Sequence, residues 1–341
     1  MAAPVPLIDF APFLNGGADE RRRVASAIGQ ACEDIGFFML TGHGVPQDLI
    51  DELVSVSYRY FALPEDEKRR ITMPPDRYRG YIPLRGDNAA ASLDDGSPSL
   101  PDLKESFSIG PFDMPDDAYC RAPAAGTFFA PNMWPAHPVE WRELWEAYYR
   151  HMERLAPAIM RSFALALEQP EDYFADRIDR HITNSSVIHY PPQPSTPAAG
   201  EARAGAHSDL GSLTIIYSDT DTGGIEVLTR DGDWFRVPRV SGALTVNLGD
   251  LMAEWTNDRW VSTSHRVVNP PRAQADQARI SLCFFHQPNY DARIECIPSC
   301  HGPDNPPRYG ATTSGAYIKR KLDLTREAPI RDDSASGPSP A

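Results

Sequence analysis

The second half of this chain contains a series of short β-rich runs, and this pattern restricts the fold more than any other feature. The runs begin at Val187 and are separated by turns that contain Gly, Asp and Pro. Short strands with such turns are typical of a closed or double-sheet antiparallel architecture. We therefore expect a mainly β fold with flanking helices and a jelly-roll core. The expected strands are Val187–Tyr190, Leu213–Tyr217, Ile225–Leu228, Trp234–Val237, Ala243–Leu248, Trp260–Val268, Ile280–His286 and Ala292–Ile297.

The first part of the chain has a mixed α/β pattern. Apolar residues at helical spacing predict helices over 19–35 and 47–62, with a buried strand at Phe37–Leu40 between them. Residues 74–137 are rich in Pro, Gly, Asp and Ala, which predicts a long irregular region. The short strands expected outside and inside that region are Pro6–Phe10, Tyr81–Ile82 and Phe107–Ile109.

A long helix is expected over 138–167, where apolar side chains recur at helical spacing. Such a stripe predicts packing against a sheet. We therefore divide the chain into an N-terminal α/β region over 1–137, a helix followed by the β-rich core over 138–326, and a polar tail over 327–341. The tail is expected to be disordered.

Composition narrows the classes of function. The formal net charge is −14, which disfavours a nucleic-acid binder because such proteins carry a basic face. The five cysteines include no CxxC pair, which disfavours a disulfide framework or a zinc knuckle.

No apolar run is long enough to span a membrane, and no signal peptide is recognisable. We expect a cytoplasmic protein, monomeric or homodimeric, that binds a small molecule and has no nucleic-acid or membrane partner.

Two histidines and one aspartate form a candidate metal site. His207 and Asp209 lie two positions apart, so their side chains project to the same side of an extended segment. His265 lies in Ser264–Val268, which reads as a strand. Either histidine alone is better read as an ordinary hydrogen-bonded residue. Together, two histidines and a carboxylate match the facial triad of non-haem iron(II) oxygenases, which leaves positions on the metal open for oxygen chemistry.

Arg279 and Ser281 form a candidate anion site, because they alternate on one face of an otherwise apolar strand. A buried arginine is costly unless it meets an anion, and its planar guanidinium suits a carboxylate. Tyr190, at the end of another expected strand, could supply a third donor. The alternative is that Arg279 forms a structural ion pair. Ser281 on the same face favours an anion site over this alternative.

The same alternation predicts the lining of a pocket. Cys283 and Phe285 fall on the face of Arg279 and Ser281, and Ile188 is a further candidate beside Tyr190. Ile280, Leu282 and Phe284 are expected on the opposite face, in the core.

Seven motifs along the chain belong together: Gly36–Gly44, His189–Pro192, Ala206–Asp209, Gly223–Val227, Asn247–Asp250, Ser264–Val267 and Arg279–Ser281. Together they resemble the isopenicillin N synthase-like family of 2-oxoglutarate/Fe(II)-dependent oxygenases, and the sequence is similar in character to bacterial and fungal members such as thymine-hydroxylase-type enzymes. The resemblance extends from Pro6 to about Leu322. At two positions the chain departs from the family: Ser186 stands where many members have Arg or Lys, and Ile188 where plant members often have Asn.

This resemblance implies a double-stranded β-helix core flanked by helices. It implies Fe(II) on His207, Asp209 and His265, and 2-oxoglutarate held by a second set of residues. It also implies a dioxygenase that oxidises, and usually hydroxylates, an unactivated C–H bond of a small molecule while 2-oxoglutarate and O2 yield succinate and CO2. Ascorbate is expected to support activity. The residues implied for 2-oxoglutarate are Arg279, Ser281 and Tyr190.

Two alternatives stay open at this point. Isopenicillin N synthase itself has the same triad and the same Arg-x-Ser pattern without using 2-oxoglutarate, so the motifs also fit a keto-acid-independent iron oxidase that cyclises or desaturates. The other alternative is a non-catalytic binding protein of the same fold, which the intact triad disfavours. For the 2-oxoglutarate-dependent dioxygenase, we expect residues 74–137 and the helix around Tyr317–Leu322 to cover the substrate.

Overall fold

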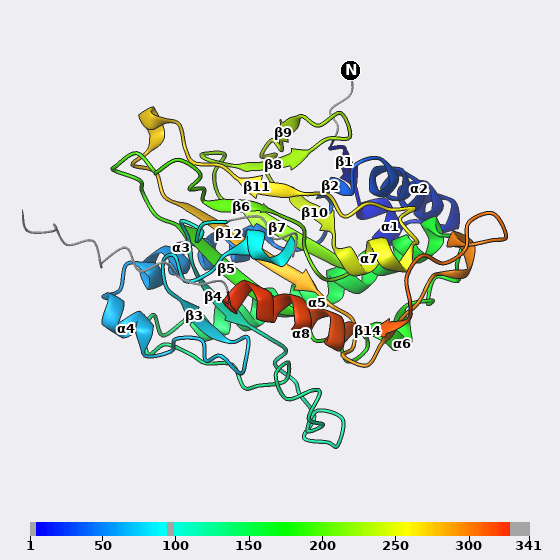
Figure 1. Cartoon of the computed structure of the whole chain (residues 1–341), viewed down its shortest axis with the longest axis horizontal. Helices are drawn as coiled ribbons and strands as arrows, with labels where there is room; N and C mark the ends of the chain where they lie inside the picture. The colour runs from blue at the N-terminus through cyan, green and yellow to red at the C-terminus, as the bar shows by residue number, and fades with distance from the viewer. Residues whose placement is uncertain (1–4, 94–98, 328–341) are drawn as a thin grey trace, which may run out of the picture.

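Two β-sheets face each other in the computed structural model, which describes residues 5–93 and 99–327 (Figure 1). Strands β5 to β12 divide equally between the sheets. The larger sheet contains β5 (Asn184–Tyr190), β7 (Leu213–Ser218), β10 (Leu244–Leu248) and β12 (Arg279–His286). The smaller sheet contains β6 (Ala204–His207), β8 (Ile225–Leu228), β9 (Trp234–Arg236) and β11 (His265–Val267). This is the double-sheet form of the expected architecture, and across the described residues the sheets do not close into a barrel.

Four strands from the first part of the chain extend the larger sheet at both edges. The order of this sheet is β1-β2-β10-β7-β12-β5-β4-β3, in which β1 and β2 are parallel and the other neighbours are antiparallel. The N-terminal region therefore completes the sheet that carries the core, and the boundary expected at residue 137 stays a prediction. The added strands are β1 (Leu7–Asp9), β2 (Phe37–Thr41), β3 (Gly80–Ile82) and β4 (Glu105–Ile109).

Helices cover the face of the larger sheet that points away from the smaller one (Figure 1). The long helix α5 (Trp141–Ala166) packs there with α2 (Ala18–Asp34) and α3 (Gln47–Phe61). The shorter helices are α1 (Ala11–Asn15), α4 (Glu65–Arg69), α6 (Ala175–Ile178), α7 (Asp250–Trp255) and α8 (Ser314–Glu327). A β13–β14 pair (Arg293–Ile294 and Thr312–Thr313) precedes α8. Among the helices of the described residues, none is both long and apolar enough to cross a membrane.

Alternation along β12 separates two cores. Ile280, Leu282 and Phe284 are fully buried against the helices, as expected from the sequence. Cys283 belongs instead to the apolar cluster between the two sheets, together with residues such as Val227 of β8. Because successive side chains of a strand point to opposite faces, the same strand builds the main core and one wall of the space between the sheets.

Parts of the expected secondary structure differ from the observed elements. The strand expected over Trp260–Val268 is reduced to His265–Val267, and that over Ala292–Ile297 to Arg293–Ile294. Strand β6 was not among the expected strands, because Ala204–His207 is made of residues with little β propensity and is held extended by pairing with β11. The disordered tail expected over 327–341 lies, after Glu327, outside the described residues.

Candidate metal centre

His207, Asp209 and His265 meet at the edge of the smaller sheet. His207 is the last residue of β6 and His265 the first of β11, and the two are directly paired across these strands. Their potential ligand atoms and those of Asp209 all lie within 4.8 Å of one another. Asp209 Oδ1 is 4.0 Å from Nε2 of His207 and 3.8 Å from Nε2 of His265. One ion can contact both atoms of each pair, because metal bonds of about 2.1 Å place two ligands up to about 4.2 Å apart.

Backbone carbonyls orient both imidazole rings. Nδ1 of His207 is 2.7 Å from the Gly205 carbonyl oxygen, and Nδ1 of His265 is 3.1 Å from that of Thr263. A ring whose Nδ1–H donates to a carbonyl keeps the lone pair of Nε2 for a metal, which is the usual arrangement around metal-bound histidines. In both residues the free Nε2 is the atom that faces Asp209.

The Asp209 carboxylate is held in the same way. The Asn247 side-chain amide donates to Asp209 Oδ2 over 2.6 Å, which leaves Oδ1 for the histidine side. Burial raises the pKa of this carboxyl group, but the neighbouring His265 and His207 outweigh it and hold the pKa below its ordinary value. Burial, with His207 nearby, lowers the pKa of His265 to about 4, so its ring is neutral near pH 7. Neutral imidazoles and an ionised carboxylate are the forms that bind metals.

The residues expected to bind an anion lie together on the larger sheet. Arg279 and Tyr190 are directly paired across β12 and β5, and Ser281 follows on the same face. The Arg279 guanidinium donates to the Thr220 carbonyl and to the Ser218 hydroxyl, which lies 3.4 Å from that of Ser281.

The charge of Arg279 has no counter-charge in direct contact. Its guanidinium is buried and forms no ion pair with a carboxylate among the described residues, and its Nε has no hydrogen-bond partner there. A structural ion pair, the alternative considered from the sequence, is therefore not what holds it. A buried cation in this state favours a ligand carboxylate.

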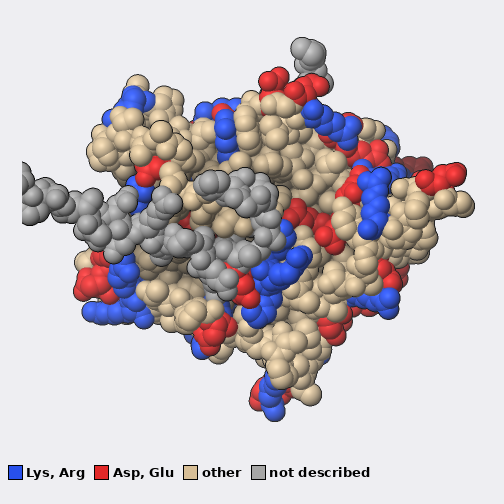
Figure 2. Space-filling view, in the orientation of Figure 1, with Lys and Arg blue, Asp and Glu red and all other residues tan. Residues whose placement is uncertain are grey.

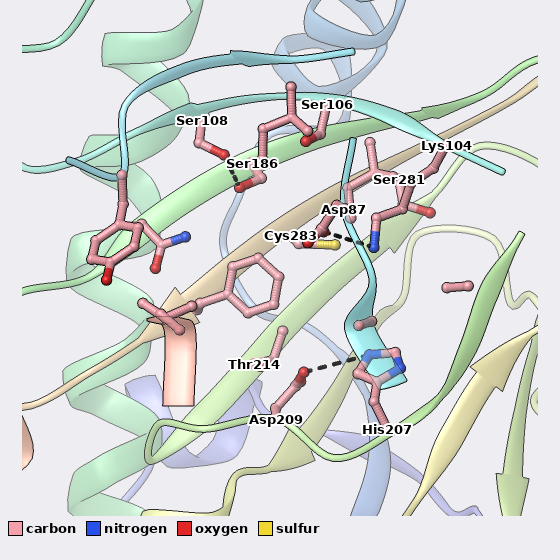
Figure 3. Close-up of a pocket in the computed structure, with 18 of the residues that line it drawn as sticks. Asp87, Lys104, Ser106, Ser108, Ser186, His207, Asp209, Thr214, Ser281 and Cys283 are labelled. Atoms are coloured by element: carbon pink, nitrogen blue, oxygen red, sulfur yellow. Dashed lines mark hydrogen bonds and ion pairs between the residues drawn. The ribbon is translucent and has the colours of Figure 1, made fainter. Parts of the chain in front are cut away.

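A cavity of about 510 Å³ connects these two groups of residues. His207, Asp209 and His265 line it from one side, and Tyr190 and Ser281 line it from the larger sheet. Figure 3 shows Ser281 and Cys283 facing the same space as His207 and Asp209. Arg279 lies behind this surface and is absent from the lining. The three expected pocket residues, Ile188, Cys283 and Phe285, all line the cavity.

A buried ionic group in the wall was not expected from the sequence. Lys104 Nζ lies 2.6 Å from an Asp102 carboxylate oxygen. It lies 3.1 Å from a carboxylate oxygen of Asp87, the pair that Figure 3 shows. Burial disfavours the charged amine, but Asp102 and Asp87 outweigh it and raise the pKa of Lys104. The three residues lie in the region where the composition predicted irregular structure, so no periodic pattern marked them.

Segments expected to cover the substrate form part of the cavity wall. Within residues 74–137, Pro74, Pro75, Tyr78 and Tyr81 to Pro83 line the cavity, and Leu322 lines it from α8. Thr72 and Met73, just before the expected segment, line it as well. Lys, Arg, Asp and Glu are interspersed over the face of the molecule that Figure 2 shows.

Family models match both parts of the chain. Residues 5–137 match the non-haem dioxygenase in morphine synthesis N-terminal family, and residues 182–288 match the 2OG-Fe(II) oxygenase superfamily. The second match contains His207, Asp209 and His265 as well as Arg279 and Ser281.

Similar proteins include a Validamycin A dioxygenase from Streptomyces hygroscopicus subsp. limoneus, with 33% identity over 87% of this chain and 80% of the relative. A 2-oxoglutarate-Fe(II) type oxidoreductase of Emericella nidulans is 33% identical over 92% of this chain and 89% of its own length. The crystal structure of a full-length Neurospora crassa protein in complex with alpha-KG and thymine matches with a TM-score of 0.81 and 29% identity, over 93% of this chain and 96% of that one.

These relatives support the 2-oxoglutarate-dependent class over the keto-acid-independent oxidase and the non-catalytic protein considered above. The fold agrees, since both sheets of the double-stranded β-helix are present. This chain belongs to the 2OG-Fe(II) oxygenase superfamily and is a 2-oxoglutarate- and iron(II)-dependent dioxygenase.

Proposed function

We propose that His207, Asp209 and His265 hold the iron of this dioxygenase. The observation that supports this most directly is the convergence of two Nε2 atoms and one carboxylate oxygen, each left free because the rest of its side chain is hydrogen-bonded elsewhere. Two imidazoles and a carboxylate suit iron(II) and leave coordination positions for other ligands. When bound, iron(II) supplies the activation of O2 that is coupled to decarboxylation of 2-oxoglutarate.

We further propose that Tyr190, Ser281 and Arg279 bind the distal carboxylate of 2-oxoglutarate. Tyr190 and Ser281 present hydroxyl groups at the cavity wall, and Arg279 supplies positive charge directly behind them. The free Nε of Arg279 is consistent with a guanidinium that lacks a carboxylate partner until a ligand arrives. This arrangement directs the keto-acid end of the ligand toward the iron site across the cavity.

The reaction that fits this site best is hydroxylation of an unactivated C–H bond of a small molecule. The cavity of about 510 Å³ is bordered by the facing sheets and by segments of the N-terminal region, and its size suits a small substrate. Validamycin A and thymine, the compounds named for two of the similar proteins, are the first to test.

Succinate production tests this proposal. Purified protein supplied with iron(II), ascorbate, O2 and 2-oxoglutarate is expected to form succinate slowly without a substrate and faster with a suitable one. Asp209→Ala should abolish both rates, whereas Asp231→Ala, at an exposed aspartate between β8 and β9, should not change them. Equal succinate formation by Asp209→Ala would remove this residue from the metal site.

We also propose that residues 72–83 and the α8 segment at Leu322 close over the substrate. They border the cavity from two separate parts of the chain, so movement of either would open it. Limited proteolysis with and without a stimulating substrate tests this. Slower cleavage within residues 72–83 in the presence of substrate is expected, and unchanged cleavage would contradict closure.

A further inference from the structure

A row of uncharged polar side chains crosses the wall of the cavity that the larger sheet forms. Ser108 of β4 and Ser186 of β5 are direct partners across the two strands, and their hydroxyl oxygens are 2.7 Å apart (Figure 3). Asn184 precedes Ser186 by two positions, so its side chain lies on the same face of β5. The Gln287 Nε2, just beyond β12, donates to Asn184 Oδ1 over 3.3 Å. All four side chains line the cavity, and we call them the polar row.

Gln287 carries the strongest indication that the polar row binds a ligand. Its side chain is only 5% exposed, yet its Oε1 has no hydrogen-bond partner among the described residues. The bond from Nε2 to Asn184 fixes the orientation of the carboxamide, so Oε1 is the end left over. A buried acceptor without a partner costs about 1–3 kcal/mol. Oε1 is shielded from solvent in this conformation, so a ligand donor would remove that cost once the cavity wall shifts on binding to admit it.

The Gln287 side chain packs next to the turn that follows Asp209. The Gln287 Cγ is 3.2 Å from the position that a Cβ on Gly211 would occupy, and Gly211 is two residues after Asp209. A molecule that donates to Gln287 therefore extends along the wall next to the turn that holds the proposed iron ligand. The polar row and the iron site face one continuous space.

The charges of the wall disfavour an anionic substrate. Lys104 is the only lysine or arginine among the described residues that line the cavity, and two carboxylates, of Asp102 and Asp87, already neutralise it. The carboxylates that line the cavity among the described residues are those of Asp87 and Asp209, and both would repel a substrate anion. A substrate carboxylate would thus be desolvated without a counter-charge, which is unfavourable, whereas N–H or O–H groups would meet Gln287 and the serine hydroxyls.

We propose that the polar row, with Gln287 as its principal acceptor, selects a non-anionic substrate rich in N–H or O–H donors, such as an amide, a ureide or a polyol. This proposed selection of substrate by the polar row rests on the proposed function, because it assumes that the substrate binds in the same cavity as the iron. Gln287 acts here by binding the substrate, and the iron-binding residues act independently of it.

Ligand binding to the full-length protein, loaded with iron(II) and 2-oxoglutarate without O2, tests the selection. Validamycin A, thymine and benzamide carry donors and no negative charge, and benzoate differs from benzamide in its charge and lost N–H groups. Binding stabilises the folded state, so each ligand's affinity is read from the rise in melting temperature with concentration. We expect at least one of the three donor compounds to bind, and benzamide to bind more tightly than benzoate.

Two variants of Gln287 distinguish a role in accepting a hydrogen bond from the substrate from a role in supporting the structure through Asn184. Gln287→Leu loses both the acceptor and the bond to Asn184, and should weaken binding of the tightest donor compound about tenfold or more. Gln287→Glu loses the donor to Asn184 but keeps an acceptor, so it should restore most of that affinity. Gln30→Leu, an equivalent change on the exposed side of α2, controls for the substitution itself. For a substrate that the enzyme converts, Gln287→Leu should raise KM more than it lowers kcat.

Three results would overturn the selection: benzoate binding as tightly as benzamide, unaltered affinity in Gln287→Leu, or equal losses in Gln287→Leu and Gln287→Glu. Failure of all three donor compounds to bind would do so as well. The visible absorption band of the iron(II)–2-oxoglutarate chelate, recorded in the same samples, distinguishes failure of the polar-row proposal from failure of the proposed function. If the band forms and no donor binds, only the polar row is misassigned, whereas absence of the band contradicts the proposed function.

Discussion

His207 and His265 face each other directly across the antiparallel pair of β6 and β11, with ring centroids 4.4 Å apart. The separation of the two rings is therefore set by the sheet and does not depend on a flexible loop. Asp209 is placed by a bridge to Gly249, in the segment that joins β10 to α7. A metal site whose ligands are fixed by regular structure needs little rearrangement when the ion binds.

Asn247 should control iron affinity without touching the metal. Its amide holds the Asp209 oxygen that faces away from the histidines. Asn247→Ala is expected to weaken iron(II) binding about 10- to 100-fold, the usual range for groups that orient a metal ligand. Anaerobic iron titration measures this, with the exposed Asn15→Ala as the matched control. Wild-type iron affinity in Asn247→Ala would show that Asp209 is oriented without the amide.

Arg279→Lys should weaken 2-oxoglutarate binding while leaving iron binding intact. Lysine keeps the charge but loses the planar fork that donates to Thr220 and Ser218, so the charge is no longer held directly behind the proposed carboxylate site. Loss of a charge-assisted hydrogen bond is worth about 1.5–3 kcal/mol, so the apparent KM for 2-oxoglutarate should rise about 10- to 100-fold. Arg22→Lys, on the exposed face of α2, is the control. An unchanged KM would assign Arg279 to structure alone.

His286 should make the protein less stable below neutral pH. Burial, with His181 nearby, lowers the pKa of His286 to about 3 from an ordinary value of 6.5. Between these values the unfolded chain binds a proton that the folded chain does not, so stability falls as the pH decreases from about 6.5 toward 3. At pH 5 the loss attributable to this residue is about 2 kcal/mol relative to pH 7.

Urea unfolding of the metal-free protein at pH 7 and pH 5 measures this effect. His286→Asn keeps a polar group beside Ser212, the hydrogen-bond partner of His286, and should reduce the pH-dependent loss by about that amount. The exposed His301→Asn should retain the wild-type dependence. The same pH dependence in His286→Asn and the wild type would place the acid sensitivity elsewhere.

The elements with a clear period could be predicted from the sequence. Alternation along β12 correctly separated Ile280, Leu282 and Phe284, in the main core, from Ser281, Cys283 and Phe285, at the cavity. The spacing of His207 and Asp209 and the strand context of His265 predicted the cluster that the fold brings together. In each case the residue types and the alternation of side chains along a strand predict the same face, and that is the face observed.

Other parts of the site depend on contacts between distant segments. Asn247 belonged to a recognised motif, but only the pairing of β10 with β7 and the bridge at Asp209 reveal what its amide contacts. Lys104 and Asp87 come from a region without periodicity, and their pairing is a tertiary contact. The Arg279 guanidinium lies behind the cavity wall, because Ser218 and Thr220 of the neighbouring segment bind it. Alternation assigns a face to a residue but does not fix the direction of a long side chain.

The most direct test of the proposed iron and 2-oxoglutarate site is anaerobic titration of the purified protein, first with iron(II) and then with 2-oxoglutarate. Wild-type protein is expected to bind one iron per chain and to develop the weak visible band of the iron(II)–2-oxoglutarate chelate. Asp209→Ala, with its fold verified by circular dichroism, should bind iron much more weakly and show no band, because only two imidazoles remain. Stoichiometric iron and an undiminished band in Asp209→Ala would contradict the assignment of His207, Asp209 and His265 as the iron site.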